Sequence, residues 1–281
     1  MSKIKKGQPL RGIITGASTG IGRGLALSLA KKYKAKLILT ARSEPELLTA
    51  REQVIASGGE AEIIVGDIAS DDMANRLVEQ CCTLYGGIDL LVNNAGMAIP
   101  GKFESLSMED WRRLFEVNFF TPLALVYASL PHLKNSKSSK IINISSVAGK
   151  ISFPGSVSYC SSKFALTALS EGIAAELTNQ VDVLTVCPGW VRTEFFEKNA
   201  VPGQKNPTLI AEKNDLTGAM MKHVLSISTA QCVDEIIKSM EKGGSHELIL
   251  TLPGRIAERF HGMAPGIMRS LVSAIPAEYN K

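Results

Sequence analysis

The sequence predicts an α/β fold in three layers, in which helices cover both faces of a doubly wound parallel seven-stranded sheet. Two observations predict it. Short apolar segments alternate with amphipathic helical segments along most of the chain, and such alternation requires crossover helices between parallel strands. A glycine-rich turn also stands between the first strand and the first helix, where such folds bind phosphates. Because no linker or repeat interrupts the pattern, the 281 residues are expected to form a single domain.

The predicted elements follow one another at short intervals. Apolar runs predict the strands, and apolar residues at helical spacing predict the helices between them. The expected strands are 12–15, 36–41, 61–65, 88–92, 140–144, 181–186 and 247–252. The expected helices are 23–33, 46–56, 71–85, a long one from Ser107, 158–178 and one that begins near Ser228. Asp110 and Gln231 follow these two serines at the spacing of capping boxes.

The glycine-rich turn has the spacing G-x-x-x-G-x-G and is followed directly by an amphipathic segment. Glycines permit positive φ angles and close approach of a ligand to the backbone, and a helix N-terminus presents free N–H groups to a pyrophosphate. The turn therefore predicts a dinucleotide site, with an ordinary glycine-rich turn as the alternative. Its expected binding residues are Gly16, Ser18, Thr19, Gly20, Ile21 and Gly22.

Tyr159 and Lys163 stand four residues apart in a segment of helical pattern, and Ser146 lies thirteen residues before the tyrosine. On a helix the i and i+4 side chains share one face, so the ammonium is expected beside the phenol. A nearby cation favours the phenolate and is expected to lower the phenol pKa from its ordinary value of about 10. Such a tyrosine can protonate an alkoxide or deprotonate an alcohol. This pair arises often by chance on solvated helices, and it gains weight from the glycine turn.

Composition and charge exclude several classes of function. The net charge of +4 is small and dispersed, which argues against nucleic-acid binding. The chain has no run of eighteen apolar residues, so no transmembrane segment is expected, and no signal peptide is expected before the first predicted strand. The five cysteines are odd in number and lack C-x-x-C spacing, which argues against disulfides and zinc and for a reducing compartment. The expected location is cytoplasmic.

Together these motifs resemble those of the short-chain dehydrogenase/reductase family, in its compact single-domain subclass with a Rossmann fold. The resemblance extends from about residue 11 to residue 252, and the motifs occur in the family's order and spacing. It implies an NAD(P)-dependent oxidoreductase that interconverts a small-molecule ketone and a secondary alcohol. The motifs are the turn at 15–22, Asn93-Asn94-Ala95-Gly96, Asn118, Ser146, Tyr159 with Lys163, and Pro188-Gly189.

The resemblance implies roles for the catalytic residues. Tyr159 would be the general acid in reduction and the base in oxidation, and Lys163 would lower its pKa and bind the nicotinamide ribose. Ser146 would hold the substrate carbonyl, and its spacing to Tyr159 selects it over its neighbour Ser145. Asn118 would bind a water that supplies protons through Lys163; a packed helix asparagine is the alternative.

The resemblance also implies cofactor contacts after three other strands. Asp67 and Ile68 would line the adenine, and Asn93 would brace the sheet. The backbone of Asn94, Ala95 and Gly96 would lie beside the adenine-side ribose. Val191 and Thr193 would hold the nicotinamide carboxamide, in the segment that begins at Pro188 and Gly189.

The end of the second strand indicates which cofactor is used. An acidic residue there accepts from the ribose 2′-OH of NAD and repels a 2′-phosphate. This chain has Ala41 at that position, followed by Arg42 and Ser43. A guanidinium suits a phosphate in charge and geometry, and Ser43 adds a hydroxyl. We therefore expect NADP(H) to be preferred over NAD(H). The alternative is that Arg42 is a solvated charge in a loop.

The substrate region departs from the alternating pattern. Residues 194–227 contain loop-forming prolines and then an amphipathic stretch, and an insertion there is usually the substrate lid in this family. Methionine and phenylalanine form adaptable apolar walls, which favour a lipophilic carbonyl substrate over a sugar or phosphorylated metabolite. Ordinary core packing is the alternative. The expected substrate contacts, besides Ser146, are Met97, Phe153, Phe195 and Met220.

Residues 253–281 exceed what the fold requires and are expected to form an amphipathic extension. It could close over the pocket, pack on a partner subunit or make peripheral contact with a membrane, and the sequence leaves these open. A homodimer or homotetramer is implied by the resemblance, through the long helices that begin near Ser107 and Ser158.

Two other functions stay open at this stage. A sugar epimerase or dehydratase on the same scaffold would carry a larger C-terminal domain and a different glycine spacing. A catalytically silent cofactor-sensing or scaffold protein would typically lose the tyrosine, the lysine or the glycines, and this chain retains all of them.

Overall fold

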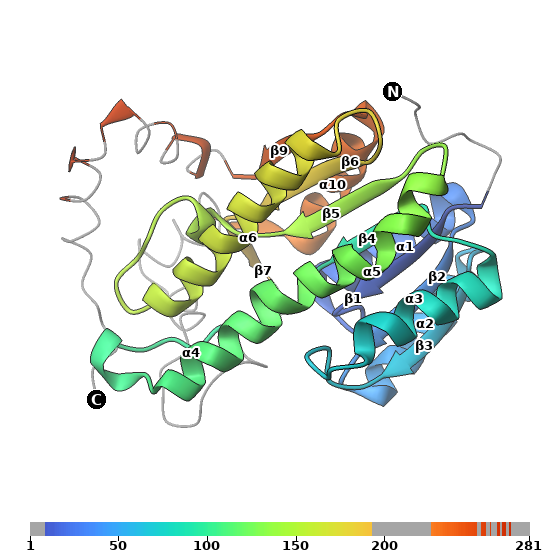
Figure 1. The fold of residues 1–281 in the computed structure, drawn as a ribbon, viewed down its shortest axis with the longest axis horizontal. Coiled ribbons are helices and arrows are strands. Elements are labelled where there is room, and N and C mark those ends of the chain that lie inside the picture. Colours follow the sequence, from blue (N-terminus) through green and yellow to red (C-terminus); the bar gives the residue numbers. More distant parts are fainter. Residues whose placement is uncertain are drawn as a thin grey trace.

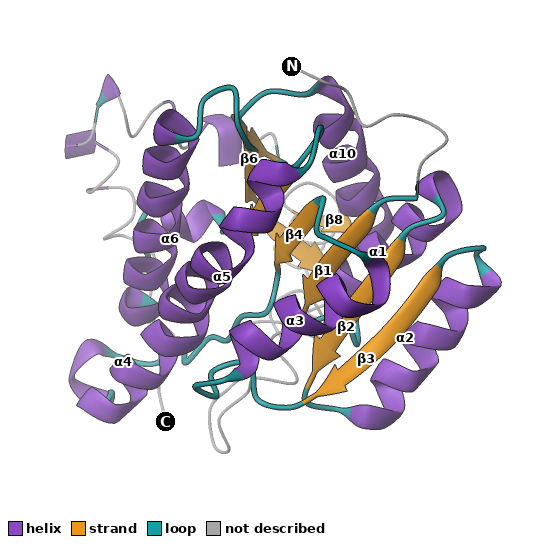
Figure 2. Cartoon of the chain, turned by 45° about the vertical axis from the view of Figure 1, so that its right-hand side comes forward, coloured by secondary structure: helices purple, strands orange, loops and turns teal. Residues whose placement is uncertain are grey.

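The computed structural model of the protein describes residues 9–192 and 226–251, with isolated positions beyond them up to residue 270. Its centre is a seven-stranded sheet in the order β3-β2-β1-β4-β5-β6-β9, with helices on both faces (Figure 1 and Figure 2). All six pairings between neighbouring strands are parallel. The predicted doubly wound α/β fold is confirmed.

Most elements lie within three residues of their predicted bounds. The strands of the large sheet are β1 (Arg11–Thr15), β2 (Lys36–Ala41), β3 (Glu60–Val65), β4 (Leu90–Asn93), β5 (Lys140–Ile144), β6 (Asp182–Cys187) and β9 (His246–Ile249). The α-helices of the described residues before β9 are α1 (Gly20–Tyr33), α2 (Glu44–Ala56), α3 (Met73–Tyr85), α4 (Met108–Phe115), α5 (Thr121–Asn135), α6 (Val157–Glu176) and α10 (Thr229–Lys242). Short 3-10 turns are η1 (Phe103–Ser105) and η3 (Val147–Gly149).

The single long helix expected after Ser107 is interrupted. Its start is confirmed, because Ser107 and Asp110 form the predicted capping box. A π-helical turn, η2 (Glu116–Phe120), then separates α4 from α5. One π turn adds a residue and shifts the phase of the apolar repeat at a single point, and a shift at one point is not evident in a long apolar segment. Such turns are frequent at functional sites, and this one contains Asn118.

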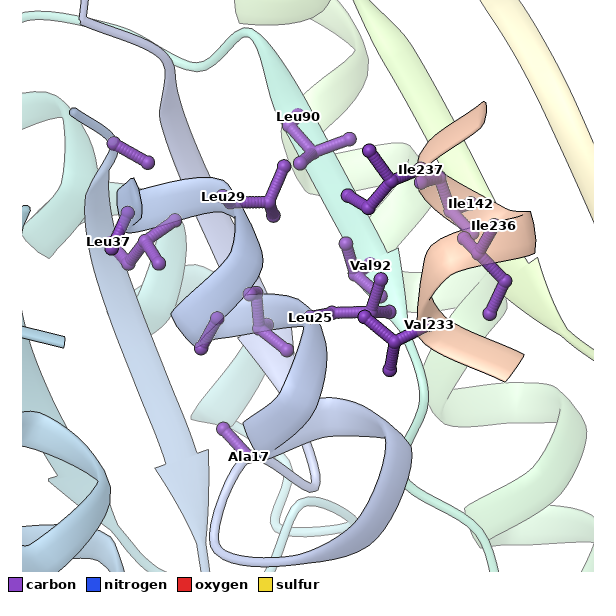
Figure 3. Packing of buried hydrophobic residues seen from close by; sticks show 14 of the residues in the cluster. Ala17, Leu25, Leu29, Leu37, Leu90, Val92, Ile142, Val233, Ile236 and Ile237 are labelled. Atoms are coloured by element: carbon purple, nitrogen blue, oxygen red, sulfur yellow. The ribbon is translucent and has the colours of Figure 1, made fainter. Parts of the chain in front are cut away.

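Two apolar layers hold the helices against the sheet. On one face Leu25 and Leu29 of α1 and Val233 of α10 pack over β4 (Figure 3). On the other face Leu77 of α3 and Leu125 of α5 belong to the second core. Because both faces are covered, the sheet is rigid and its strands are almost continuously apolar. This sheet positions the loops at the carboxyl ends of the strands.

One helical stretch of the described residues, Met108–Asn135, is apolar and long enough to cross a membrane by these two criteria alone, with a mean hydropathy of 1.3 over its most apolar window. This is weak evidence for a membrane span, since core helices have the same properties. The stretch packs against α3 and α6, and 44% of that window is buried.

A second, two-stranded sheet joins the two ends of the predicted lid. β7 (Trp190–Arg192) pairs in parallel with β8 (Ser226–Ser228). The sequence did not predict these strands, because three residues are too few to show a period. Nearly all of the lid 194–227 and most of the extension 253–281 lie outside the described residues, as do Thr193, Phe195 and Met220.

The strand order reverses between β1 and β4, which pair with each other at the centre of the sheet. Successive helices leave such a point in opposite directions, and the crevice outside the carboxyl ends of the strands there is where ligands bind. The glycine turn follows β1, and the Asn94–Gly96 segment follows β4. The fold therefore brings these two predicted cofactor segments together.

Candidate active site

The glycine turn between β1 and α1 has the backbone that the sequence predicts. Gly16 has a φ of +62°, and a Cβ on Gly22 would lie 2.3 Å from the Gly16 carbonyl oxygen. Both positions therefore require glycine. Thr19 precedes α1 without making a side-chain cap, and the first turn of α1 has no acidic residue. The N–H groups at this helix end are thus available to an anion, which fits the pyrophosphate of a dinucleotide.

The end of β4 locks the glycine turn. Asn94 Nδ2 donates to the carbonyl oxygens of Thr15 (2.9 Å) and Gly16 (3.0 Å). The Thr15 hydroxyl accepts from the backbone N–H groups of Asn94 (3.0 Å) and Ala95 (2.9 Å). Asn93 instead donates to Asn143 on β5 (2.8 Å), so it braces the sheet as predicted. Thr15 was not among the predicted site residues, although a threonine directly before the first glycine is a signal for this contact.

Tyr159 and Lys163 lie one turn apart on α6, with Lys163 Nζ 5.8 Å from the centroid of the phenol ring. Lys163 is buried, and its ammonium donates to the carbonyl of Ile144 at the end of β5 (2.9 Å). The Ser146 hydroxyl forms a hydrogen bond with the Tyr159 phenol and accepts from the N–H of Ala148 (3.0 Å). The structure thus brings the predicted serine, tyrosine and lysine together.

Ser145, the alternative to Ser146, faces the core. Its hydroxyl donates to the Lys163 carbonyl (3.1 Å) and lies 2.7 Å from the Thr167 hydroxyl. The residue is buried, whereas Ser146 is partly exposed. The choice of Ser146 from its spacing agrees with this geometry.

The pKa of Tyr159 is raised in the structure, whereas the sequence predicts that it is lowered. Burial raises the pKa of Tyr159 to about 12, and the hydrogen bond with Ser146 offsets only part of that effect. Burial also lowers the pKa of Lys163 to about 8. The expectation is therefore wrong for this structure, because burial of the phenol raises its pKa more than the hydrogen bond with Ser146 lowers it. A phenol with a raised pKa is neutral at pH 7, which is the form that donates a proton.

Asn118 is completely buried in η2 and ties two segments of the site together. Its Oδ1 accepts from the Met97 N–H (2.9 Å), and its Nδ2 donates to the Met97 carbonyl (2.9 Å) and the Ser162 hydroxyl (3.0 Å). Ser162 in turn donates to the Tyr159 carbonyl (2.8 Å). Both amide hydrogens are used, so the side chain has one lone pair left for a water. These contacts are those of a packed helix asparagine, the alternative interpretation of Asn118. Its binding of a water that supplies protons through Lys163 stays a prediction.

The adenine side of the site lies after β2 and β3. Arg42 follows β2 directly, and Ser43 precedes α2 without making a side-chain cap. Asp67 and Ile68 follow β3, which pairs with β2. Asp67 forms an ion pair with Arg113 of α4. Arg113 was not among the predicted site residues, because no local pattern indicates a contact between residues so far apart in the chain.

The remaining predicted residues lie in the segments that follow β4, β5 and β6. The Pro188 carbonyl accepts from Val147 (2.9 Å), and a Cβ on Gly189 would lie 2.4 Å from Thr251 Oγ1. Val191 is buried in β7. Two of the four predicted substrate residues beside Ser146 are described, Met97 and Phe153; the latter donates its N–H to the buried Cys160 thiol (3.4 Å).

A family model described as "short chain dehydrogenase" matches residues 12–202. The chain belongs to this family. The predicted resemblance is confirmed, and the epimerase and scaffold alternatives lose their support. As a member of this family, the protein is an oxidoreductase that acts on CH–OH donors, with an NAD(P)-binding Rossmann fold.

The chain resembles curated relatives over most of its length. It is 32% identical over 201 residues to a "CLA biosynthesis dehydrogenase/reductase" of Lactiplantibacillus plantarum, covering 69% of this chain and 70% of that protein. It is 34% identical over 233 residues to a ketoacyl reductase of Nostoc sp., covering 82% and 81%. A short-chain dehydrogenase/reductase of Burkholderia phymatum, solved in complex with NAD, has the same fold, with a TM-score of 0.80 and 22% identity over 94% of this chain and 96% of that one.

Proposed function

We propose that the protein is an NADP(H)-dependent reductase that converts a lipophilic ketone into a secondary alcohol, with Tyr159 as the general acid. The observation that carries the proposal is the hydrogen bond between Tyr159 and Ser146, with Lys163 on the next turn of α6. These groups lie at the carboxyl edge of the same sheet as the glycine turn. The reductase names of the relatives agree with this direction.

The residues divide the reaction between them. Ser146 binds the substrate carbonyl oxygen, and Tyr159 donates its proton to that oxygen as the alkoxide forms. The nicotinamide cofactor, when bound, supplies the hydride. The Lys163 ammonium stabilises the phenolate that remains on Tyr159. Because burial raises the pKa of Tyr159, the proton stays on the phenol until an alkoxide takes it, which favours reduction at neutral pH.

Cofactor choice rests on Arg42. Ala41 stands where an acidic residue would bind the ribose 2′-OH, and Arg42 follows it directly. The Arg42 guanidinium and the Ser43 hydroxyl suit a 2′-phosphate. NADP(H) is therefore preferred over NAD(H) in this proposal.

The substrate class rests on the apolar side chains near the tyrosine. Met97 is held by Asn118, and Phe153 is tied to Cys160 next to Tyr159. Such side chains favour a medium-chain or ring ketone over a small polar one. The lid residues Phe195 and Met220 belong to the same proposal.

Location and assembly complete the proposal. The five cysteines are free thiols in the structure, which suits the cytoplasm. A homodimer or homotetramer forms through α5 and α6, which lie side by side on one face of the molecule (Figure 1 and Figure 2). Both helices expose large apolar side chains there, among them Tyr127 and Phe164.

A ketone panel tests the function directly. Oxidation of NADPH and NADH is followed by absorbance with medium-chain, ring and small polar ketones. We expect turnover with NADPH and the first two classes. Tyr159→Phe should lose at least about a hundredfold in kcat, because the proton donor is removed, while the Kd for NADPH stays within about twofold.

The outcomes separate the parts of the proposal. Binding of NADPH without turnover of any ketone would favour a cofactor sensor. Higher kcat/KM with NADH would reject the role of Arg42, and higher kcat/KM on small polar ketones would reject the substrate class. Full activity of Tyr159→Phe would reject the general acid.

A further inference from the structure

The loop after β3 is held in place by side chains of α4 and α5. Arg113 of α4 forms an ion pair with Asp67 Oδ2, and the hydroxyl of Thr121, which begins α5, donates to the Ile68 carbonyl (3.5 Å). The other carboxylate oxygen of Asp67 accepts from the N–H of Ala69 (3.0 Å). Both oxygens of Asp67 therefore have partners, and the position of its charge is fixed.

Asp67 lies beside Arg42 at the carboxyl edge of the sheet. β2 and β3 pair in register at Ala41 and Val65, and the Gly66 N–H donates to the Ala41 carbonyl (3.0 Å). Arg42 and Asp67 each come within two residues of these paired positions. Burial alone would raise the pKa of Asp67, but the hydrogen bond from Ala69 and the charges of Arg113 and Arg42 lower it overall. The two arginines thus act on one carboxylate.

This arrangement poses an electrostatic problem for a 2′-phosphate beside Arg42. An unpaired carboxylate next to a phosphate dianion repels it and also competes with it for the guanidinium of Arg42. Within the part of the chain that the structure describes, Arg42 makes no ion pair, and the ion pair of Asp67 is with Arg113.

We propose that Arg113 is a specificity-determining residue, which neutralises Asp67 and so keeps Arg42 available for the 2′-phosphate of NADP(H). The inference rests on the cofactor preference proposed above. Arg113 acts through Asp67 and does not touch the phosphate, so it is a positioning residue. A threonine or leucine on α4 in its place would leave the carboxylate to oppose the phosphate.

Two small ligands isolate the effect. 2′,5′-ADP and 5′-AMP differ only in the 2′-phosphate, and their Kd values for the full-length protein can be measured by calorimetry. For Arg113→Gln we expect the preference for 2′,5′-ADP over 5′-AMP to fall about threefold to tenfold, as for the loss of one partly screened charge. Adding Asp67→Asn to Arg113→Gln should restore most of the preference. Arg113→Lys, which keeps the charge, should stay near the wild type.

Arg112→Gln is the matched control. Arg112 neighbours Arg113 on α4 but is exposed, so its removal changes the net charge equally and should leave the preference unchanged. Equal weakening of both ligands in Arg113→Gln would indicate a purely structural contact and overturn the proposal. Failure of Asp67→Asn to restore the preference would also overturn it, since Arg113 would then bind the phosphate itself.

The wild-type protein tests the proposed cofactor separately. If it binds 5′-AMP as well as 2′,5′-ADP, the NADP(H) preference is rejected. The change caused by Arg113→Gln would still be measurable in that case, so the two failures can be told apart. Thermal melting of each variant checks that the fold is intact.

Discussion

The Lys163 ammonium has to be charged for its proposed role, but its burial disfavours the charged form. The charge is needed to stabilise the Tyr159 phenolate, yet the side chain is 3% exposed and donates to a single described carbonyl, that of Ile144. Burial therefore lowers its pKa to about 8. Near neutral pH the lysine keeps its charge at a cost in stability, which is common where catalytic groups are buried.

The first prediction follows from that cost. The pKa of Lys163 falls from 10.5 in the unfolded chain to about 8 in the folded one. Between these pH values the unfolded state binds more protons, so the free energy of unfolding rises with pH. We expect wild type to gain about 2 kcal/mol relative to Lys163→Met between pH 8 and pH 10. Urea unfolding at each pH measures the difference.

Lys31→Met controls for the loss of one positive charge. Lys31 is exposed on α1, so the difference between this variant and the wild type should stay nearly constant over the same pH range. A constant difference for Lys163→Met as well would mean that Lys163 is not a buried charge.

At the scale of elements, the turn between β1 and α1 depends on the absence of two side chains. A Cβ on Gly22 would lie 2.3 Å from the Gly16 carbonyl oxygen and 2.5 Å from Asn94 Nδ2. Both atoms are held, since Asn94 donates to that same carbonyl. The turn has no room to adjust without moving the end of β4.

Gly22→Ala should therefore disturb the fold locally and the cofactor site strongly. We expect a loss of about 1–3 kcal/mol in the free energy of unfolding, as for other overpacked positions, and at least tenfold weaker binding of NADPH. Gly172→Ala is the matched variant, because Gly172 lies within α6, near its C-terminal end, with no atom within 4 Å of an added Cβ. It should stabilise the protein by about 0.5–1 kcal/mol. Comparable losses in both variants would argue against the steric explanation.

Sequence patterns predicted the elements well where the signal is local. Both capping boxes, at Ser107 and at Ser228, are present. The π turn around Asn118 was not predicted, because a phase shift at a single turn of a long apolar segment is not evident from the residue pattern. The direction of the Tyr159 pKa shift was predicted wrongly for a different reason. Spacing gives the distance to Lys163, but burial, which dominates the pKa, is set by the whole fold.

At the scale of the whole molecule, the site is assembled from segments far apart in the sequence. The resemblance could assign Tyr159, Ser146 and the glycine turn because each carries a motif. Arg113 carries none, and its contact with Asp67 exists only because α4 folds back to the end of β3. Contacts of this kind depend on tertiary structure, and one sequence alone does not encode them in a readable pattern.

The last prediction concerns the face formed by α5 and α6. Phe120 of η2, directly before α5, is 50% exposed, Tyr127 of α5 72% and Phe164 of α6 39%. A group of exposed large apolar side chains marks a candidate interface. Ala168 lies one turn after Phe164 and is also exposed. If this face joins two copies about a two-fold axis, Ala168→Arg places an unpaired charge in the interface from both subunits. We expect the mass measured by light scattering to fall to that of a smaller assembly.

Ala56→Arg provides the control, since Ala56 is exposed at the end of α2, on the opposite face of the sheet. It adds the same charge and should leave the mass unchanged. A wild-type protein that is monomeric at micromolar concentration would contradict the predicted assembly. An unchanged oligomer in Ala168→Arg would place the interface elsewhere, because a buried unpaired charge costs several kcal/mol and an interface of ordinary size does not tolerate two of them.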